Sequence, residues 1–272
     1  MAIVLLGLAL LVGIRADDIE INKTACSAEF GMVSLENGVL SIDGFLDQPL
    51  YRCFKAIYTS NTRVVEVRSS GGTPEASLGI AEALAVHRPT VRVHNFCASA
   101  CAHLLLPIAS KIEADPDSII LFHHTATSTY ESLGERAQES SSRFKSLSVR
   151  ELALYARVGV SPWLLRAPFA AQEPVCEAIG LTVDGNASAD YKARFKAVLI
   201  DRRTLMLAGL HLSSAVVDTL PELLAVAHKL PDSGAGLLAG GITYLSAPSN
   251  TGALASSWGS RSLPVLPICG KD

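Results

Sequence analysis

Ser99 lies in a short stretch whose residue types suit nucleophilic chemistry. The residues Thr90–Val93 alternate in polarity and are rich in β-branched side chains, which predicts a strand, whereas Ala100–Leu106 is small and then apolar, which predicts a buried helix. Ser99 stands at the junction, where its hydroxyl would lie near the positive end of the helix and near free backbone N–H groups. This place suits a nucleophile whose product is an oxyanion, and it equally suits an ordinary helix cap.

Two further stretches carry residues that could complete such a site. A strand predicted over 63–67 is followed by Gly71 and Gly72, and a strand predicted over 118–123 ends at His123. In sheets with parallel strands, sites form at the carboxyl ends of the strands. We therefore expect the glycines, Ser99 and His123 to meet at one edge of a sheet.

Each of these residues also has a purely structural explanation. Gly71 and Gly72 could form only a strand-to-helix turn, and His123 could be a hydrogen-bonded core residue. His124 complicates the assignment, because neighbouring strand residues point to opposite faces and only one of the two histidines could meet Ser99.

The region 31–124 alternates between strand and helix patterns. Two alternating stretches, Met32–Leu35 and Val39–Asp43, flank Asn37-Gly38, which is a strong hairpin signal. Further along, we expect helices over 47–60, 73–86 and 100–110 between strands over 63–67, 90–96 and 118–123. This alternation predicts an α/β fold with a mostly parallel sheet and helices packed on it.

The chain beyond residue 124 is less regular. The polar run from Thr125 to Arg136 is typical of a mobile flap. Helical patterns are expected over 137–158, from 161, and over 174–179, 189–210 and 214–230. The segment 246–272 is rich in Ser, Gly and Pro, which predicts a loop.

Composition bounds the class of protein. The 272 residues are 49% hydrophobic and 18% charged, with a formal net charge of −3 and no basic run, so we expect a sizeable core and no nucleic-acid surface. The N-terminal run of apolar residues is too short to span a bilayer and fits a signal peptide over residues 1–16, with an uncleaved membrane anchor as the alternative. Either interpretation places the rest of the chain outside the cytoplasm.

The chain has six cysteines, which can form disulfides in an oxidising compartment outside the cytoplasm. An even number predicts disulfides, and the six allow 15 full pairings. Cys97 and Cys101 are four residues apart and could pair across one helical turn, which we favour over free buried thiols. A thiol redox role for this pair is a further alternative, although the spacing is not the usual redox spacing. No zinc-type spacing is present, so no metal is expected.

The order of these stretches resembles the Clp protease proteolytic subunit and its extracytoplasmic relatives in the crotonase-like superfamily. The sequence ending in Gly71-Gly72 resembles the family's Ser-Pro-Gly-Gly loop, and Ser99 matches the nucleophile of its Ala-Ala-Ser-Met pattern. His123, 24 residues after Ser99, matches the family's catalytic histidine, and Glu173–Leu181 looks like its Ala-Pro-Glu-Ala-x-x-x-Gly-Leu stretch.

The resemblance implies a fold and a mechanism. It implies repeated β-β-α units over 17–185. The segment 186–272 extends past the matched region, and its own patterns predict a helical extension and a loop-rich tail. Ser99 would attack a carbonyl while His123 takes its proton, and the N–H groups of Gly72 and Ala100 would face the oxyanion. The position of the family's catalytic aspartate falls near Pro168, where no acid stands, so the site is a Ser-His dyad or takes an acid from elsewhere, with Glu173 the nearest candidate.

Two functions are consistent with these residues. The first is an exported serine hydrolase, a peptidase that acts on peptides or proteins without an ATPase partner and without a cofactor. The second is a catalytically inactive member of the same fold that acts as a binding or assembly module. By resemblance, we expect a homo-oligomer in both cases, and the N-terminal segment would bring the protein near a membrane if it is retained.

Overall fold

The structure is a computed structural model. It describes residues 20–21, 24–133, 141–170, 175–183, 186–194, 197–227 and 242–245. The predicted N-terminal signal over 1–16, the candidate acid Glu173, Cys269 and the tail over 246–272 lie outside the described residues.

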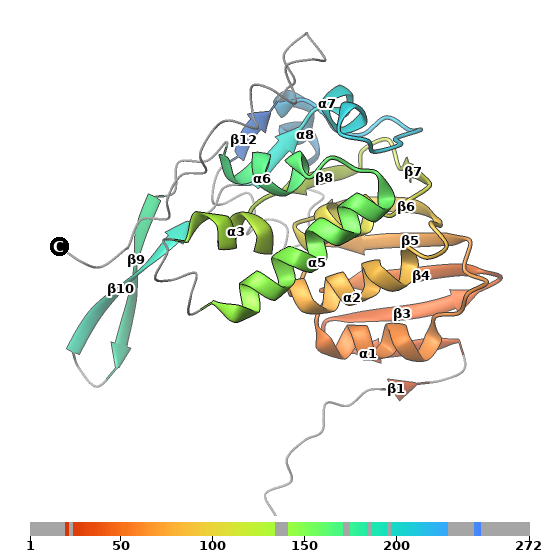
Figure 1. The fold of residues 1–272 in the computed structure, drawn as a ribbon, viewed down its shortest axis with the longest axis horizontal. Helices are drawn as coiled ribbons and strands as arrows, with labels where there is room; N and C mark the ends of the chain where they lie inside the picture. The colour runs from red at the N-terminus through yellow and green to blue at the C-terminus, as the bar shows by residue number, and fades with distance from the viewer. Residues whose placement is uncertain are drawn as a thin grey trace, which may run out of the picture.

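One mixed sheet organises the described chain (Figure 1). Its strands lie in the order β1-β2-β3-β4-β5-β6-β8-β11-β12, and β7 also pairs with β6. Strands β4 to β8 pair in parallel, as do β11 and β12, whereas β1 to β4 form antiparallel pairs and β8 pairs antiparallel with β11. The predicted α/β class with a mostly parallel sheet is confirmed. The strands are β1 (Glu20–Ile21), β2 (Ala25–Ala28), β3 (Gly31–Glu36), β4 (Val39–Gly44), β5 (Val64–Ser69), β6 (Thr90–Ala98), β7 (Lys111–Ala114), β8 (Ile119–Phe122), β11 (Ala197–Ile200) and β12 (Ile242–Leu245).

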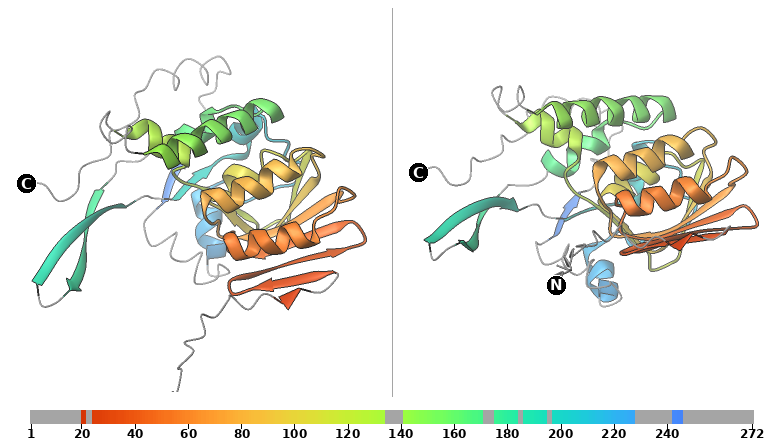
Figure 2. Two further views of the ribbon diagram at one scale, coloured as in Figure 1. Left: turned by 60° about the horizontal axis from the view of Figure 1, so that its bottom comes forward. Right: turned by 90° about the horizontal axis from the view of Figure 1, so that it is seen from below.

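The two faces of the sheet differ in polarity. In β5 and β6, Val65, Val67, Val91 and Val93 are buried, and the helices α1 (Gln48–Ile57) and α2 (Pro74–Leu84) cover their side, with α5 (Ser142–Val158) packed outside α2 (Figure 2). The opposite side chains are polar, as in the ion pair between Glu66 on β5 and Arg92 on β6. The short helix α8 (Leu220–Val226) covers a smaller apolar patch on that second face.

The Asn37-Gly38 hairpin is confirmed. Strands β3 and β4 pair antiparallel from Glu36 and Val39 outward, and Asn37 and Gly38 have φ angles of 51° and 79°. Two consecutive positive φ angles are what a two-residue turn with the twist of its flanking strands requires. The helix that follows also begins as expected, because the carboxylate of Asp47 accepts a hydrogen bond from Leu50 N–H and caps α1.

The polar segment after residue 124 is not a flap in its described part. Residues Ala126–Ser132 form the helix α3, and Ala126, Thr127 and Ser128 are buried. The prediction was wrong because the hydroxyls of this segment are satisfied inside the protein: Thr125 and Ser128 form a reciprocal capping box at the start of the helix. The neighbouring helices α5 and α6 (Trp163–Ala170) are found where helices were expected.

The helices expected over 174–179 and 189–210 are replaced mainly by strands. Residues Val175–Val183 and Asn186–Arg194 pair antiparallel as β9 and β10, and the helix α7 spans only Arg202–Leu207. The signal was in the sequence, because residues 187–194 alternate strictly between apolar and polar types and Asp184-Gly185 is a typical hairpin dipeptide. Strands β11 and β12 then join the main sheet, so the sheet continues beyond residue 185 and the later segment is not only a helical extension.

The disulfide between Cys26 and Cys53 ties β2 to α1 and encloses a loop with a sequence separation of 27. We predict that the double substitution Cys26→Ala, Cys53→Ala lowers the free energy of unfolding by about 3 kcal/mol, because the cross-link no longer limits the unfolded chain. Urea denaturation followed by circular dichroism measures the change. A loss below about 1 kcal/mol would show that this bridge contributes little to the fold.

Candidate active site

Ser99 occupies a left-handed turn between β6 and a helical segment. Its φ is 57°, its side chain is 7% exposed, and its N–H donates to the carbonyl of Leu121 on β8 at 2.9 Å. The next residue, Ala100, opens the π-helix η1 (Cys101–Leu105), and His103 N–H donates back to the carbonyl of Ser99 at 3.0 Å. A helix-capping residue normally has extended backbone angles. The positive φ of Ser99 therefore disagrees with the ordinary cap interpretation.

Gly71 lies directly against Ser99. A Cβ atom built on Gly71 would stand 2.4 Å from Cβ and 2.8 Å from Oγ of Ser99, and Gly71 has a φ of 106°. Both the contact and the backbone angle require glycine at this position. The Gly-Gly loop and Ser99, 28 residues apart in sequence, therefore form one site.

The neighbouring backbone supplies donors. Gly71 N–H is taken by Ser69 Oγ at 3.1 Å, whereas Gly72 N–H has no hydrogen-bond partner within the described part of the chain. Gly72 also packs on the carbonyl of Leu46, since a Cβ there would lie 2.1 Å from that oxygen. Ala100 stands at the start of the helical segment, where N–H groups have no acceptor within the helix. Within the described part of the chain, neither predicted oxyanion donor has a recorded hydrogen-bond acceptor.

A disulfide brackets Ser99. Cys97 at the end of β6 and Cys101 at the start of η1 are both buried and joined, with their Cα atoms 5.3 Å apart. The bond closes a ring of five residues with Ser99 at its centre. It restricts the backbone of the turn from both sides.

His123 and His124 lie just beyond the end of β8 and not within it. The strand ends at Phe122, so the two rings do not point to opposite faces as expected; their Nδ1 atoms are 3.1 Å apart. Burial lowers the pKa of His123 to about 4, which leaves this ring neutral at pH 7. Among the described residues, no hydrogen bond joins His123 to the Ser99 hydroxyl. The histidine is at the correct strand end, but its ring faces His124.

A buried histidine that the sequence analysis passed over holds this loop in place. His103, 2% exposed, lies in η1, and its Nε2 is 2.8 Å from the carbonyl oxygen of His123. Burial, with a smaller contribution from the nearby His123, lowers the pKa of His103 to about 3. With its proton on Nε2, the neutral ring donates to that carbonyl; in the other tautomer, Nε2 accepts from the N–H of His123 at 3.3 Å. Tyr155 on α5 completes the contact by donating its hydroxyl to the His103 carbonyl at 2.7 Å.

Glu151 is the second residue that the sequence analysis missed. Its buried carboxylate accepts hydrogen bonds from the N–H of Ala126 and from the N–H and hydroxyl of Thr127, at 3.3, 2.8 and 2.7 Å. Burial raises its pKa, although these hydrogen bonds oppose the rise. The sequence contained a signal for this role, because Glu151 follows Leu147 by four residues and so lies on the apolar stripe of α5. Glu151 holds the N-terminus of α3, the helix that begins two residues after His124.

The third member of a catalytic triad is not found among the described residues. Pro168, at the position where the resemblance places an acid, lies inside α6. Glu173 lies outside the described residues, and Glu151 is engaged with the backbone of α3. In the described part of the chain, no group of three or more His, Cys, Asp or Glu side chains is arranged to hold a metal ion. No helix of that part is long and apolar enough to cross a membrane.

Comparisons with known proteins do not identify a family or a function for this chain. No family model and no curated protein matches the chain. Among solved structures, the chain is similar to an enoyl-CoA hydratase from Mycobacterium avium subsp. paratuberculosis K-10, with 18% sequence identity and a TM-score of 0.28. The match covers 38% of this chain and spans half the length of that structure. The residues of the site must therefore carry the functional interpretation by themselves.

We predict that Gly71→Ala destabilises the protein by at least about 2 kcal/mol, because the methyl group collides with Ser99 and the backbone angle disfavours any side chain. Gly159→Ala is the matched control. Gly159 also has a positive φ, of 74°, but a Cβ there meets nothing within 4 Å, so only about 1 kcal/mol is expected. Thermal and urea unfolding of both variants measures the difference. Equal losses would contradict the close contact at Gly71.

Acidification should destabilise the fold through His103. Its folded-state pKa of about 3 lies below the ordinary value of 6.5, so the unfolded chain binds the proton first and stability is lost as the pH falls below about 6.5. Between pH 7 and pH 5 the expected loss from this group is about 2 kcal/mol. His103→Gln, which keeps a donor for the His123 carbonyl, should remove that part of the pH dependence. His211→Gln, at an exposed histidine, is the control. If the free energy of unfolding of His103→Gln depends on pH as steeply as that of the unaltered protein, the prediction is contradicted.

Proposed function

We propose that this protein is an exported serine hydrolase, a peptidase that works without an ATPase partner. Ser99 Oγ attacks the carbonyl of a peptide or protein substrate, and His123 takes the hydroxyl proton and returns it to the leaving amine. The N–H groups of Gly72 and Ala100 bind the oxyanion, a role in which one donor contributes roughly 3 kcal/mol to lowering the barrier.

The left-handed conformation of Ser99 against Gly71 is the observation that supports this proposal most directly. A serine that only caps a helix has no need of a positive φ, which costs free energy for any residue with a Cβ. Such outliers persist where the surrounding structure holds them, and here the Cys97–Cys101 bond and the contact with Gly71 do so. The turn presents a hydroxyl next to unused backbone donors at the carboxyl end of β6.

The proposed base needs one movement. His123 now faces His124, so the proposed chemistry requires its ring to turn toward Ser99. Burial lowers the pKa of His123 to about 4, so the ring is neutral at pH 7 and can accept a proton, but it is a weak base. We therefore expect slow turnover compared with a peptidase that has a complete triad.

Two disulfides support the proposed location, because such bonds form and persist outside the reducing cytoplasm. Export through a signal over residues 1–16, with retention as a membrane anchor as the alternative, belongs to this proposal. Assembly into a homo-oligomer belongs to it as well and rests on the resemblance to the Clp peptidase.

A binding or assembly module is the second candidate. It is favoured by the absence, among the described residues, of a hydrogen bond between Ser99 and His123 and of an acid beside His123. In that case the site would hold a peptide carbonyl on the backbone donors without cleaving it.

Labelling with a fluorophosphonate separates the two candidates. We expect the purified protein to be labelled, Ser99→Ala to show no label, and His123→Ala to react at least 100-fold more slowly because the general base is lost. Ser34→Ala, a serine on β3 away from the site, is the control and should label like the unaltered protein. Rates are measured by mass spectrometry of the intact protein.

Two results would contradict the hydrolase proposal. Labelling that persists in Ser99→Ala would place the reactive group elsewhere. No labelling of a folded protein with both disulfides intact would favour the binding module.

A further inference from the structure

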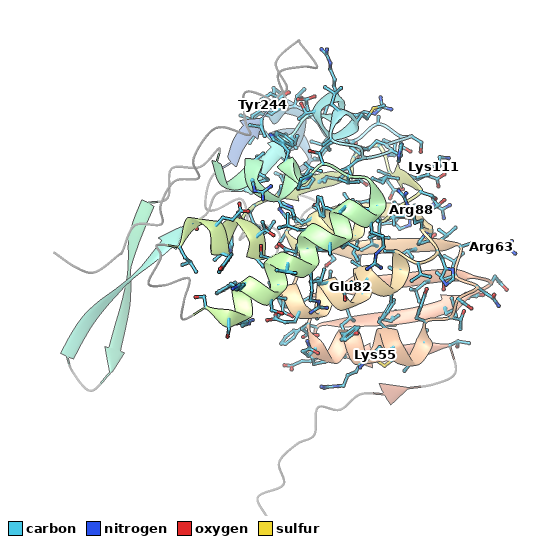
Figure 3. The ribbon with its side chains drawn as sticks, in the orientation of Figure 1. Lys55, Arg63, Glu82, Arg88, Lys111 and Tyr244 are labelled. Atoms are coloured by element: carbon cyan, nitrogen blue, oxygen red, sulfur yellow. A yellow bond between two sulfur atoms is a disulfide. The ribbon has the colours of Figure 1, made fainter. Side chains whose placement is uncertain are left out.

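A cavity lies at the end of the sheet opposite to Ser99, where β5 and β6 begin. It has a volume of about 380 Å³ and is formed by the loop between α1 and β5, the loop between α2 and β6, and Ser110. Figure 3 labels Arg63 and Arg88 on the side of the molecule away from α3, which follows the candidate active site. The cavity therefore belongs to neither the Ser99 turn nor its histidines.

The lining of this cavity is basic and rich in hydroxyl groups. Arg63, His87 and Arg88 supply the basic side chains, and no acidic residue lines it. Thr62, Thr90 and Ser110 are among the residues that add hydroxyls. This combination favours an oxyanion, because guanidinium and hydroxyl groups both donate to its oxygen atoms.

Arg88 is positioned by the fold and has donors to spare. One terminal nitrogen donates to the carbonyl of Ala109 at 3.2 Å, whereas Nε is buried and has no hydrogen-bond partner within the described residues. Its φ of 48° places it in the left-handed region, just after α2, at a position where helices usually have glycine or asparagine. Both the left-handed backbone and the unpaired guanidinium N–H of Arg88 destabilise the folded protein. A ligand that binds to the guanidinium group would offset this cost.

Thr62 gives an independent indication. Its side chain is 5% exposed and lines the cavity, yet its hydroxyl has no hydrogen-bond partner among the described residues. A buried hydroxyl without a partner is unfavourable, and such groups are rare in folded proteins. The surrounding backbone is fixed, since Thr90 N–H donates to Arg63 O at 3.0 Å and Ser110 N–H donates to Pro89 O at 3.1 Å.

We propose that this cavity binds a phosphate-type oxyanion, with Arg88 as its main charged ligand and the Thr62 hydroxyl as a buried donor. Arg63 and His87, which are exposed, close the outer side. The volume is larger than one phosphate group needs and lies within the usual range for small-molecule sites, so a phosphate monoester fits as well as the free ion. The proposal does not depend on hydrolase activity at Ser99.

Isothermal titration of the purified full chain with inorganic phosphate tests the site, with sodium chloride at equal ionic strength as the reference. Arg88→Gln should weaken phosphate binding at least tenfold, because a charge-assisted hydrogen bond is lost. Arg143→Gln is the matched control: it removes one exposed positive charge near the start of α5, far from the cavity, and should change binding less than twofold.

Thr62→Val separates a binding role from a structural one. It removes a hydroxyl that has no partner in the free protein, so the melting temperature without phosphate should not fall, while phosphate affinity should fall several-fold. Glycerol phosphate is titrated in parallel, and tighter binding than phosphate identifies a monoester as the preferred ligand. Binding no stronger than that of chloride, or equal losses in Arg88→Gln and Arg143→Gln, would overturn the proposal.

Discussion

The approach of Gly71 to Ser99 is the contact on which the candidate active site depends. No side chain fits between the glycine loop after β5 and the turn after β6, so the two loops touch through backbone and the Ser99 side chain. This contact is possible because β5 and β6 are parallel neighbours, which brings both carboxyl ends to one edge of the sheet. The disulfide across the turn then limits where Ser99 can move.

A buried polar layer on the helical side holds the histidine loop at the same edge. His103 contacts the backbone of His123, and Glu151 binds the first N–H groups of α3, so the chain between them is fixed at both ends. These groups lie where an unpaired polar atom is costly. Both carboxylate oxygens of Glu151 accept hydrogen bonds, whereas Nδ1 of His103 has no partner among the described residues. The loop that carries His123 is therefore held by buried contacts on both sides.

The sheet carries different chemistry at its two ends. At the carboxyl ends of β5 and β6, the glycine loop lies against Ser99. At their amino ends, two arginines and a histidine line a cavity that has no acidic residue in its lining. Parallel strands produce this separation, because every loop that leaves a strand lies at one edge and every loop that enters lies at the other. A ligand at the amino end would contact the loops that lead into the same two strands.

The sequence by itself determined the local elements and their order. Asn37-Gly38 specifies its hairpin through backbone angles that few other residues accept, and the alternation of strands and helices up to residue 124 predicts the parallel sheet, with Gly71, Ser99 and His123 at strand ends. Only the tertiary structure decided which of these groups meet. The sequence could not show that β8 stops before His123, since strand ends depend on pairing with distant residues. It also could not assign a role to Glu151. This carboxylate lies on the apolar stripe of α5, and its hydrogen-bond partners are N–H groups at the start of α3, which only folding brings next to it.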